Sequence, residues 1–340
     1  MPNPALFVSP AADRARLPVL LLTGFLGAGK TTLINRLLAH PALADTAVAI
    51  NEFGEVPLDS HLIDHGAERT VMLANGCLCC TLSGDFESAA MRVFTRRATG
   101  EIPRFARLIV EPSGLADPAP IAQAILRAPR LARCFRLEAI LAVADATGIA
   151  DALARQPEAA RQLACADLIA LSKTDRAPPG ARERMAPLLA AAAPDAELLP
   201  PAPGPDDLPP GFLDPAAPLA RPRAARPFAD PPDPGHLAAT EAVTLTAADP
   251  LDWRALEAWL REIRLGHADS LLRLKGLLDI AGQAGPVLLQ GVGHVVDAPV
   301  AWPRWPDQDR RSRLVLILRG TPGAPIRAAW ARDLPGLLAH

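Results

Sequence analysis

The chain has 340 residues, half of them hydrophobic, and its formal net charge at pH 7 is −2. This length suits two domains with sizeable cores. The near-neutral charge indicates neither a nucleic-acid partner nor a membrane-surface partner. No apolar run is as long as a membrane span, and residues 1–17 lack the apolar core of a signal peptide. We therefore expect a cytoplasmic protein in which residues 1–17 form a flexible tail.

A glycine-rich stretch at residues 24–31, Gly-Phe-Leu-Gly-Ala-Gly-Lys-Thr, lies between an apolar run (residues 18–22) and residues 32–38, where leucines recur at helical spacing. A strand, a glycine-rich loop and a helix in this order predict a phosphate-binding loop rather than a chance glycine turn. Glycines let successive N–H groups face phosphate oxygens, and the helix N-terminus adds partial positive charge. The residues expected to contact phosphates are Gly24, Gly27, Ala28, Gly29, Lys30, Thr31 and Thr32.

Lys30 and Thr31 have further expected roles in this loop. The Lys30 ammonium would neutralise the β- and γ-phosphates and so take part in catalysis, and the Thr31 hydroxyl would bind Mg²⁺. Acidic residues follow the next predicted strand, residues 46–50. Glu52 and Glu55 stand where open α/β sheets bind ligands, and they could face the Mg²⁺ or a second metal. A solvated turn is the alternative, and Asp59 carries the same ambiguity.

Three cysteines, Cys77, Cys79 and Cys80, follow a third predicted strand at residues 70–73. Thiolates are soft ligands that suit Zn²⁺ or Cu(I). A helix expected over residues 83–97 would lower the pKa of nearby thiols through its positive end. Metal binding is the favoured interpretation, while a switching dithiol and a set of buried small hydrophobes are the alternatives.

Residues 106–111 predict a strand that ends in the sequence Glu-Pro-Ser-Gly, residues 111–114. An acidic residue at a strand end followed by glycine suits a loop that senses Mg²⁺ and the γ-phosphate. The Gly114 N–H could contact that phosphate, so the loop would move on hydrolysis. A helix is expected to begin at Asp117 and Pro118.

Two further buried strands carry polar residues at their ends. Residues 137–145 end in Asp145, which either supports the nucleotide site or caps a helix. Residues 166–172 lead into Ser-Lys-Thr-Asp at residues 172–175. The Asp175 carboxylate can accept both N1–H and the exocyclic amine of guanine, and the Lys173 stem can cover the ring. This pattern favours GTP as the nucleotide.

These patterns predict an α/β fold, namely a doubly wound, mainly parallel P-loop NTPase sheet in residues 18–199, whose last strand lies in residues 195–199. Proline-rich residues 200–236 are expected to form a linker, and residues 237–340 a smaller α+β C-terminal domain. In this domain we expect strands at residues 240–246, 271–279, 287–296 (bulged at its glycines) and 312–318. We also expect one helix that begins at Asp249 and Pro250, and a second helix over residues 325–338.

The C-terminal domain offers three weaker candidates. His294 could be a ligand or a pH-sensitive contact, although a lone histidine is usually structural. Arg273 and Lys275 could touch phosphate or a client protein, with a solvated face as the default interpretation.

The motifs at residues 24–31, 51–55, 76–80, 111–114 and 172–175 occur in the order seen in CobW-like metallochaperone GTPases, which the chain resembles from about residue 18 to residue 320 outside the linker. Residues 273–276 and 290–294 also look like that family's C-terminal domain. The resemblance implies a SIMIBI-class GTPase that uses GTP and Mg²⁺ to control delivery of Zn²⁺, or of Co²⁺, to a client metalloprotein.

By motif matching, the resemblance implies roles for individual residues. Lys30 and Thr31 would contact phosphates and Mg²⁺, Glu52 and Glu111 would belong to the switch and metal region, Lys173 and Asp175 would contact guanine, and Cys77, Cys79 and Cys80 would hold the transition metal. Glu111 is the better candidate for the general base. The chain departs from the family pattern in two ways: Ser172 replaces an asparagine in the base motif, and the seven histidines are scattered rather than clustered. The second departure argues for a single tight metal site rather than bulk storage.

The leading hypothesis is slow GTP hydrolysis coupled to metal loading and release, with a metal- or nucleotide-dependent homodimer as a further expectation. The main alternative is a metal-buffering or regulatory binding protein with little turnover. A small-metabolite kinase would leave the three cysteines unexplained.

Overall fold

The computed structural model describes residues 7–50, 71–72, 83–214 and 240–334. Contacts divide the chain into two compact units. The N-terminal unit comprises residues 16–189 and 196–217, and the C-terminal unit comprises residues 1–15, 190–195 and 218–340. We describe each unit by itself.

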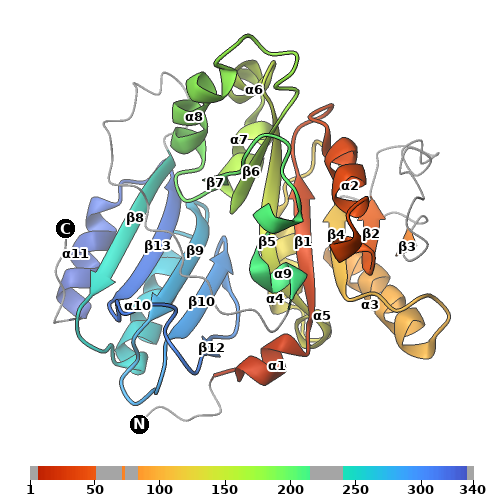
Figure 1. Cartoon of the computed structure of the whole chain (residues 1–340). Helices are drawn as coiled ribbons and strands as arrows, with labels where there is room; N and C mark the ends of the chain where they lie inside the picture. Colours follow the sequence, from red (N-terminus) through yellow and green to blue (C-terminus); the bar gives the residue numbers. More distant parts are fainter. Residues whose placement is uncertain (1–6, 51–70, 73–82, 215–239, 335–340) are drawn as a thin grey trace. The chain divides into compact units, whose positions relative to one another are not determined.

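The N-terminal unit contains a seven-stranded sheet in the order β3-β2-β4-β1-β5-β6-β7, and every strand pair in it is parallel (Figure 1). Its strands are β1 (Leu17–Thr23), β2 (Thr46–Ile50), β3 (Val71–Met72), β4 (Arg107–Glu111), β5 (Phe135–Asp145), β6 (Leu168–Ser172) and β7 (Glu197–Leu198). All residues of β1 and β4 are buried, as expected for parallel strands covered on both faces. The predicted doubly wound parallel sheet is confirmed.

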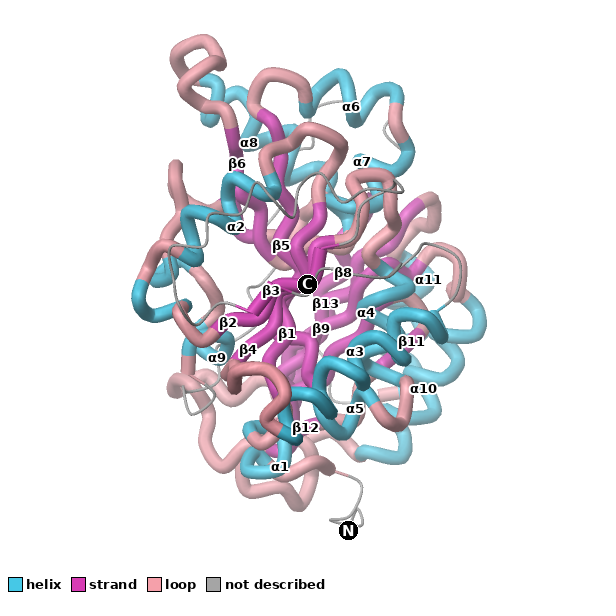
Figure 2. Tube along the Cα trace, turned by 90° about the vertical axis from the view of Figure 1, so that its right-hand side faces the viewer, coloured by secondary structure: helices cyan, strands magenta, loops and turns pink. Residues whose placement is uncertain are grey.

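Helices cover both faces of this sheet, with α3, α4 and α5 on one side and α2 and α9 on the other (Figure 2). The bounds of the helices are α2 (Lys30–Leu38), η2 (Pro41–Leu43), α3 (Ser83–Thr99), α4 (Ala119–Arg127), α5 (Leu131–Cys134), α6 (Ile149–Arg155), α7 (Pro157–Ala164), α8 (Ala181–Ala192), η4 (Pro205–Asp207) and α9 (Pro210–Leu213). Helix α2 buries Leu33, Ile34, Leu37 and Leu38 against the sheet, which is the helical spacing predicted for residues 32–38.

The start of the proline-rich segment differs from the expected linker. Residues 205–213 form η4 and α9 and belong to the N-terminal unit. Phe212 is fully buried in the core under β1, and the Arg107 guanidinium donates hydrogen bonds to the carbonyls of Ala42, Phe212 and Leu213 at 2.7–3.0 Å. The composition of residues 205–213 alone predicts no fixed structure. The segment is held in place because the Phe212 ring is buried and because Arg107 provides hydrogen bonds to its carbonyls. Residues 215–239 lie outside the described part of the chain.

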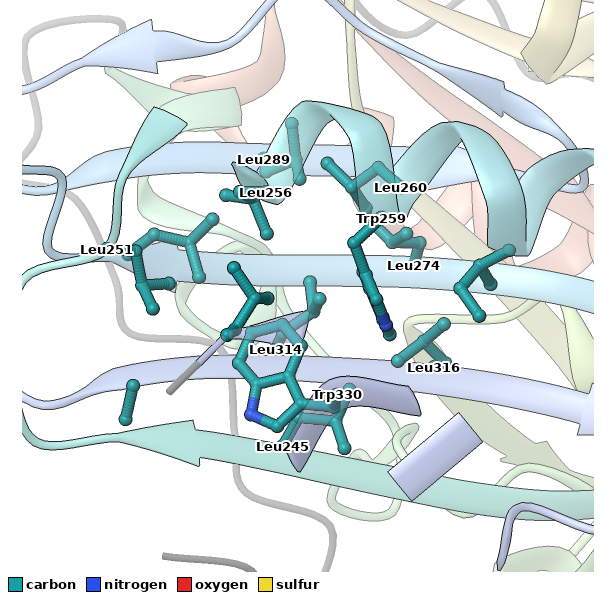
Figure 3. Close-up of a cluster of buried hydrophobic side chains, with 14 of the residues drawn as sticks. Leu245, Leu251, Leu256, Trp259, Leu260, Leu274, Leu289, Leu314, Leu316 and Trp330 are labelled. Carbon is teal, nitrogen blue, oxygen red and sulfur yellow. The ribbon is translucent and has the colours of Figure 1, made fainter. Parts of the chain in front are cut away.

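The C-terminal unit contains a six-stranded antiparallel sheet in the order β11-β10-β9-β13-β8, with β12 paired to β10. Its elements are α1 (Pro10–Arg14), β8 (Thr240–Ala247), α10 (Trp253–Gly266), β9 (Leu271–Leu278), β10 (Val287–Val292), β11 (Val295–Val296), β12 (Val300–Ala301), β13 (Ser312–Arg319) and α11 (Ala324–Asp333). The α10 and α11 helices pack on one face of the sheet, where Trp259 and Trp330 meet edge to face with ring centroids 4.9 Å apart among buried leucines (Figure 3).

The expected flexible tail is wrong for residues 7–17. Phe7 packs edge-on against Trp253 with ring centroids 5.0 Å apart, and the Val8 N–H donates to the Pro299 carbonyl at 2.8 Å. The Ser9 side chain caps α1, and Leu17 already belongs to β1. Tertiary contacts therefore order a stretch that lacks a strong local pattern.

Two expected elements of the C-terminal unit also differ. The single bulged strand at residues 287–296 is a hairpin, β10 and β11, whose turn at Gly293 has a φ of 57°. Glycine adopts this left-handed conformation without strain. The helix expected from Asp249 begins at Trp253, because the Asp252 side chain accepts from the Ala255 N–H at 2.9 Å and caps it.

Candidate functional site

Sheet topology gathers the candidate residues of the N-terminal unit at one edge. The β1 strand lies between β4 and β5, and β6 follows β5. Because all these strands are parallel, their carboxyl ends meet at the same edge. The glycine-rich loop after β1 therefore shares this edge with Glu111, Asp145 and Ser172, which end β4, β5 and β6.

The glycine-rich loop has the backbone that phosphate binding requires. Gly24, Gly27 and Gly29 have φ values of 145°, 69° and 92°. A side chain at Gly24 would overlap the Val143 carbonyl oxygen on β5, so glycine is needed there for space as well as for conformation. Lys30 begins α2 immediately after the loop, and Thr31 and Thr32 follow it on the helix. Consecutive N–H groups at a helix N-terminus form an anion site, so these residues fit the phosphates of a nucleotide.

Lys30 lies at the centre of the loop. Its Nζ donates to the Gly24 carbonyl at 3.0 Å and lies 3.9 Å from Glu111 Oε1. Both side chains are buried, with Lys30 8% and Glu111 5% exposed as residues. A buried cation and a buried carboxylate next to an anion-binding loop are groups that can neutralise phosphate, hold a water or ligate Mg²⁺. The structure thus brings together two of the predicted catalytic residues.

The loop that follows Glu111 lies directly against the glycine-rich loop. A Cβ placed on Gly114 would come 2.9 Å from the backbone nitrogen of Leu26, which shows how closely the two loops approach. The Ala116 N–H donates to the Ser113 carbonyl at 2.9 Å and closes a tight turn. Gly114 therefore lies beside the glycine-rich loop, and its contact with the γ-phosphate stays a prediction.

One contact to this loop was not anticipated. The buried side chain of Gln162 on α7 donates to the carbonyls of Gly114 and Ala116. The only sequence signal for it is a polar residue on the apolar face of a short helix that buries Ala159 and Leu163.

The predicted base motif connects to the glycine-rich loop through its first residue. The Ser172 hydroxyl donates to the Ala28 carbonyl at 2.6 Å, so this serine links the end of β6 to the glycine-rich loop. Lys173 has a φ of 52°, and its Nζ donates to Asp145 Oδ2 at 2.6 Å. Asp175 is exposed to solvent.

Asp145 holds the Lys173 side chain but does not cap a helix, because the N-cap residue of α6 is Gly148 and no side chain caps that helix. The Oδ2 atom of Asp145 receives Lys173, while its Oδ1 accepts from the N–H of Thr147 at 2.8 Å in the turn before α6. Burial acts to raise the pKa of Asp145, but the hydrogen bonds from Lys173 and Thr147 outweigh it and lower the pKa from 3.8. Asp145 is therefore a carboxylate at neutral pH and fixes the Lys173 ammonium.

All the predicted metal ligands except Thr31 lie outside the described residues. These are Glu52, Cys77, Cys79 and Cys80, together with the weaker candidates Glu55 and Asp59. Within the described ranges, no group of three or more His, Cys, Asp or Glu residues is arranged to hold a metal ion. Of the predicted metal ligands, the structure places only Thr31, at the second position of α2.

The candidates in the C-terminal unit have structural surroundings. Arg273 is 2% exposed, and its guanidinium donates to the Gly291 carbonyl at 3.1 Å, so the solvated face expected for it is wrong. Lys275 is half-buried. His294 is exposed in the β10–β11 turn, where its backbone carbonyl accepts from Arg264 Nε at 2.6 Å. No helix in the described part of the chain is long and apolar enough to cross a membrane.

Comparisons with known proteins agree with this arrangement. Residues 18–200 match the model of the CobW/HypB/UreG nucleotide-binding domain, and residues 240–333 match the cobalamin synthesis protein CobW C-terminal domain. The Escherichia coli protein named zinc chaperone YjiA is 35% identical over 327 residues, covering 93% of this chain and 98% of that protein. A Schizosaccharomyces pombe protein named zinc-regulated GTPase metalloprotein activator 1 is 34% identical over 166 residues, covering 47% of this chain and 39% of its own length.

A solved structure is similar over nearly the whole chain. The crystal structure of Zn(II)-bound YjiA GTPase from E. coli has a TM-score of 0.68 and 29% identity, and the match covers 94% of this chain and 99% of that one. Two matched family models and a relative of almost equal length agree on the same assignment. The chain belongs to the CobW/HypB/UreG family of nucleotide-binding proteins, with a CobW C-terminal domain after the nucleotide-binding domain.

Proposed function

We propose that this protein hydrolyses GTP in the cytoplasm and couples hydrolysis to the binding of a transition metal and its transfer to a client metalloprotein. Zn²⁺ is the metal that we favour. The observation that carries the proposal is the meeting of Lys30 and Glu111, 3.9 Å apart, beneath the glycine-rich loop. The Ser172–Ala28 hydrogen bond supports a single nucleotide site that extends from phosphates to base.

In this proposal the phosphate contacts come from the loop and the start of α2. The contributing residues are Gly24, Gly27, Ala28, Gly29, Lys30, Thr31 and Thr32. The Lys30 ammonium offsets negative charge on the β- and γ-phosphates, and Glu111 accepts a proton from the attacking water or orients it. When bound by Thr31 and Glu52, Mg²⁺ supplies further charge neutralisation on the phosphate oxygens. Asp175 reads the guanine edge, and Lys173, fixed by Asp145, covers its face.

The transition metal is the cargo of the reaction. Cys77, Cys79 and Cys80 supply three thiolates, a ligand set that suits Zn²⁺ and accepts Co²⁺. The names of the relatives, zinc chaperone and zinc-regulated GTPase metalloprotein activator, support zinc as the metal and a protein as its recipient. Coupling requires that the GTP and GDP forms hold the metal with different affinity, because equal affinity shifts no equilibrium. A homodimer that depends on metal or nucleotide is part of the same proposal.

The test of the enzymatic part is phosphate release from GTP by the wild-type protein, Lys30→Ala and the control Arg36→Ala. Arg36 is an exposed cation in the last turn of α2, the helix that Lys30 begins. We expect turnover to fall by about 10³-fold in Lys30→Ala, since charge-stabilising groups in such sites contribute on this order, and to stay unchanged in the control. Absence of turnover in the wild type, with any metal present, would instead favour the metal-buffering binding protein.

The test of the cargo part is a Zn²⁺ titration of the reduced protein with a non-hydrolysable GTP analogue and with GDP. We expect a tight site whose affinity differs between the two nucleotides and which is lost when Cys77, Cys79 and Cys80 are replaced by Ser. Cys134→Ser is the matched control, because Cys134 is a partly exposed free thiol on α5. Equal affinity with both nucleotides would refute coupling, and tight binding by the triple variant would refute the ligand assignment.

A further inference from the structure

Gln162 makes an unusual connection between α7 and the loop after Glu111. Its side chain is 1% exposed. Its Nε2 donates two hydrogen bonds of 3.0 Å each, one to the carbonyl of Gly114 and one to the carbonyl of Ala116. The Gln162 amide group thus binds two carbonyls that are two residues apart in the loop after Glu111. Two bonds from one group fix both the position and the orientation of that loop.

The two polar atoms of the Gln162 side chain have different surroundings. Burying an amide is unfavourable unless its polar atoms are hydrogen-bonded. Its neighbours on α7 that are buried with it, Ala159, Leu163 and Ala164, are apolar. Among the described residues, Gln162 Oε1 has no hydrogen-bond partner. The two bonds from Nε2 to the loop are therefore the polar contacts that compensate for burial of this side chain, and its contacts are directed at the loop.

The loop held by Gln162 is the one that meets the nucleotide site. Gly114 lies against Leu26 of the glycine-rich loop so closely that a Cβ would approach the Leu26 backbone to 2.9 Å. The turn is also closed by the Ala116 N–H bond to the Ser113 carbonyl at 2.9 Å. Rotation or retreat of Gly114 from this position must stretch the bond from Gln162 to the Gly114 carbonyl, and movement of the whole turn must stretch the bond to the Ala116 carbonyl as well.

We propose that Gln162 is a positioning residue that holds Gly114 in the orientation in which its N–H meets the γ-phosphate of GTP. This inference rests on the proposed function, because it assigns the loop to the γ-phosphate. It concerns a residue outside the nucleotide-binding motifs, 48 positions from Gly114 along the chain. GDP lacks the γ-phosphate, so the contribution of Gln162 is specific to the triphosphate.

The experiment compares Gln162→Met and Gln162→Glu with matched changes at Gln156. Methionine preserves length and removes both donors. Glutamate preserves shape, and as a carboxylate it repels the two carbonyls. Gln156, the exposed residue that precedes α7, makes no capping hydrogen bond with its side chain, so Gln156→Met and Gln156→Glu control for the chemistry of each substitution.

For Gln162→Met we expect kcat for GTP to fall by about tenfold, the effect of losing one or two hydrogen bonds that act at the transition state. The affinity for a non-hydrolysable GTP analogue should fall by a similar factor, while the affinity for GDP stays within about twofold. The Gln156 variants should match the wild type in all three measurements.

Gln162→Glu adds a pH-dependent readout that a purely structural role would not give. Burial raises the pKa of a carboxyl group, and the neutral acid regains one O–H donor. Turnover by Gln162→Glu, divided by wild-type turnover at the same pH, should therefore rise as the pH is lowered, whereas the same ratio for Gln162→Met stays constant. A constant ratio for both variants would contradict a role for the hydrogen bonds.

Two further results would overturn the inference. One is kcat within twofold of the wild type in both Gln162 variants. The other is an equal loss of affinity for GDP and for the GTP analogue, which would mark a general structural role. If the wild type does not hydrolyse GTP faster than Lys30→Ala does, the proposed function fails. The inference about Gln162 can still be decided in that case, by comparing the ratio of GTP-analogue affinity to GDP affinity between Gln162→Met and the wild type.

Discussion

Both units have an apolar core and some buried polar side chains, Arg273 among them in the C-terminal unit, but the units differ in whether the strand ends bring polar side chains together. The N-terminal unit buries Lys30, Glu111, Arg107 and Gln162, each hydrogen-bonded or paired near a strand end or behind the sheet. The C-terminal unit buries mainly tryptophan, leucine, isoleucine and valine between its sheet and two helices. The difference follows from topology: parallel strands bring their carboxyl ends to one edge, while antiparallel strands place successive ends at opposite edges. Residues distant in sequence can therefore form a polar site in the first unit.

The largest effect is expected from breaking the apolar core of the C-terminal unit. Trp259 is 2% exposed and meets Trp330 edge to face in Figure 3. Trp259→Ala should lower the free energy of unfolding of this unit by about 4 kcal/mol, through lost burial and the cavity left behind. Chemical denaturation followed by circular dichroism and hydrogen exchange measures it.

Leu265→Ala is the control for this change, because Leu265 lies on the same helix and is 78% exposed. Its effect should stay within about 0.5 kcal/mol. If Trp259→Ala were equally mild, the apolar core would not be the main source of stability in this unit.

The next effect tests a buried cation in the N-terminal unit. Arg107 donates to three carbonyls, two of which belong to α9. Arg107→Met should lower the free energy of unfolding by about 3 kcal/mol, because buried carbonyls lose charged donors. It should also speed proteolysis near residues 205–213. Arg104→Met, at an exposed arginine close by, should change neither quantity, and equal protection of residues 205–213 in both variants would show that Arg107 does not anchor them.

The third prediction concerns the backbone of the phosphate loop. In Gly24→Ala the added methyl meets the Val143 carbonyl, and the φ of 145° disfavours alanine. We expect about a hundredfold loss of GDP affinity, or about 2.7 kcal/mol, measured by calorimetry. Gly100→Ala is the matched control, since Gly100 also has a positive φ but has open space around its Cα. Unchanged GDP affinity in Gly24→Ala would place the phosphates elsewhere.

The smallest effect sharpens the comparison at the proposed guanine-binding end of the site. Asp145→Asn releases Lys173, so guanine-nucleotide affinity should weaken by about fivefold, or about 1 kcal/mol. The lowered pKa of Asp145 means that its ion pair stabilises the protein above the ordinary carboxyl pKa of 3.8, and that this stabilisation is lost only as pH falls through the still lower folded-state value. The affinity ratio between wild type and variant should therefore be flat across neutral pH. Asp151→Asn, on the exposed face of α6, is the control, and a ratio that changes near pH 7 would contradict this assignment.

Much of the fold was predictable because its signals are local. The strands predicted at residues 46–50 and 312–318 are observed as Thr46–Ile50 and Ser312–Arg319, since apolar β-branched runs read directly as strands. The helix predicted after the glycine-rich loop is observed from Lys30. The errors at residues 7–17 and 205–213 occurred where order depends on contacts with distant parts of the chain.

By itself the sequence determined the strand, glycine-rich loop and helix of the phosphate site, and the acidic or polar residues that end the neighbouring strands. These depend on backbone angles open to glycine and on hydrophobic periodicity, both of which are properties of short segments. The tertiary structure alone decided that Ser172 holds Ala28, that Asp145 holds Lys173 and that Gln162 holds Gly114. Each pair joins residues that are far apart in the chain, and the two side chains or loops meet only after the parallel sheet has formed. No local sequence pattern can therefore predict these contacts.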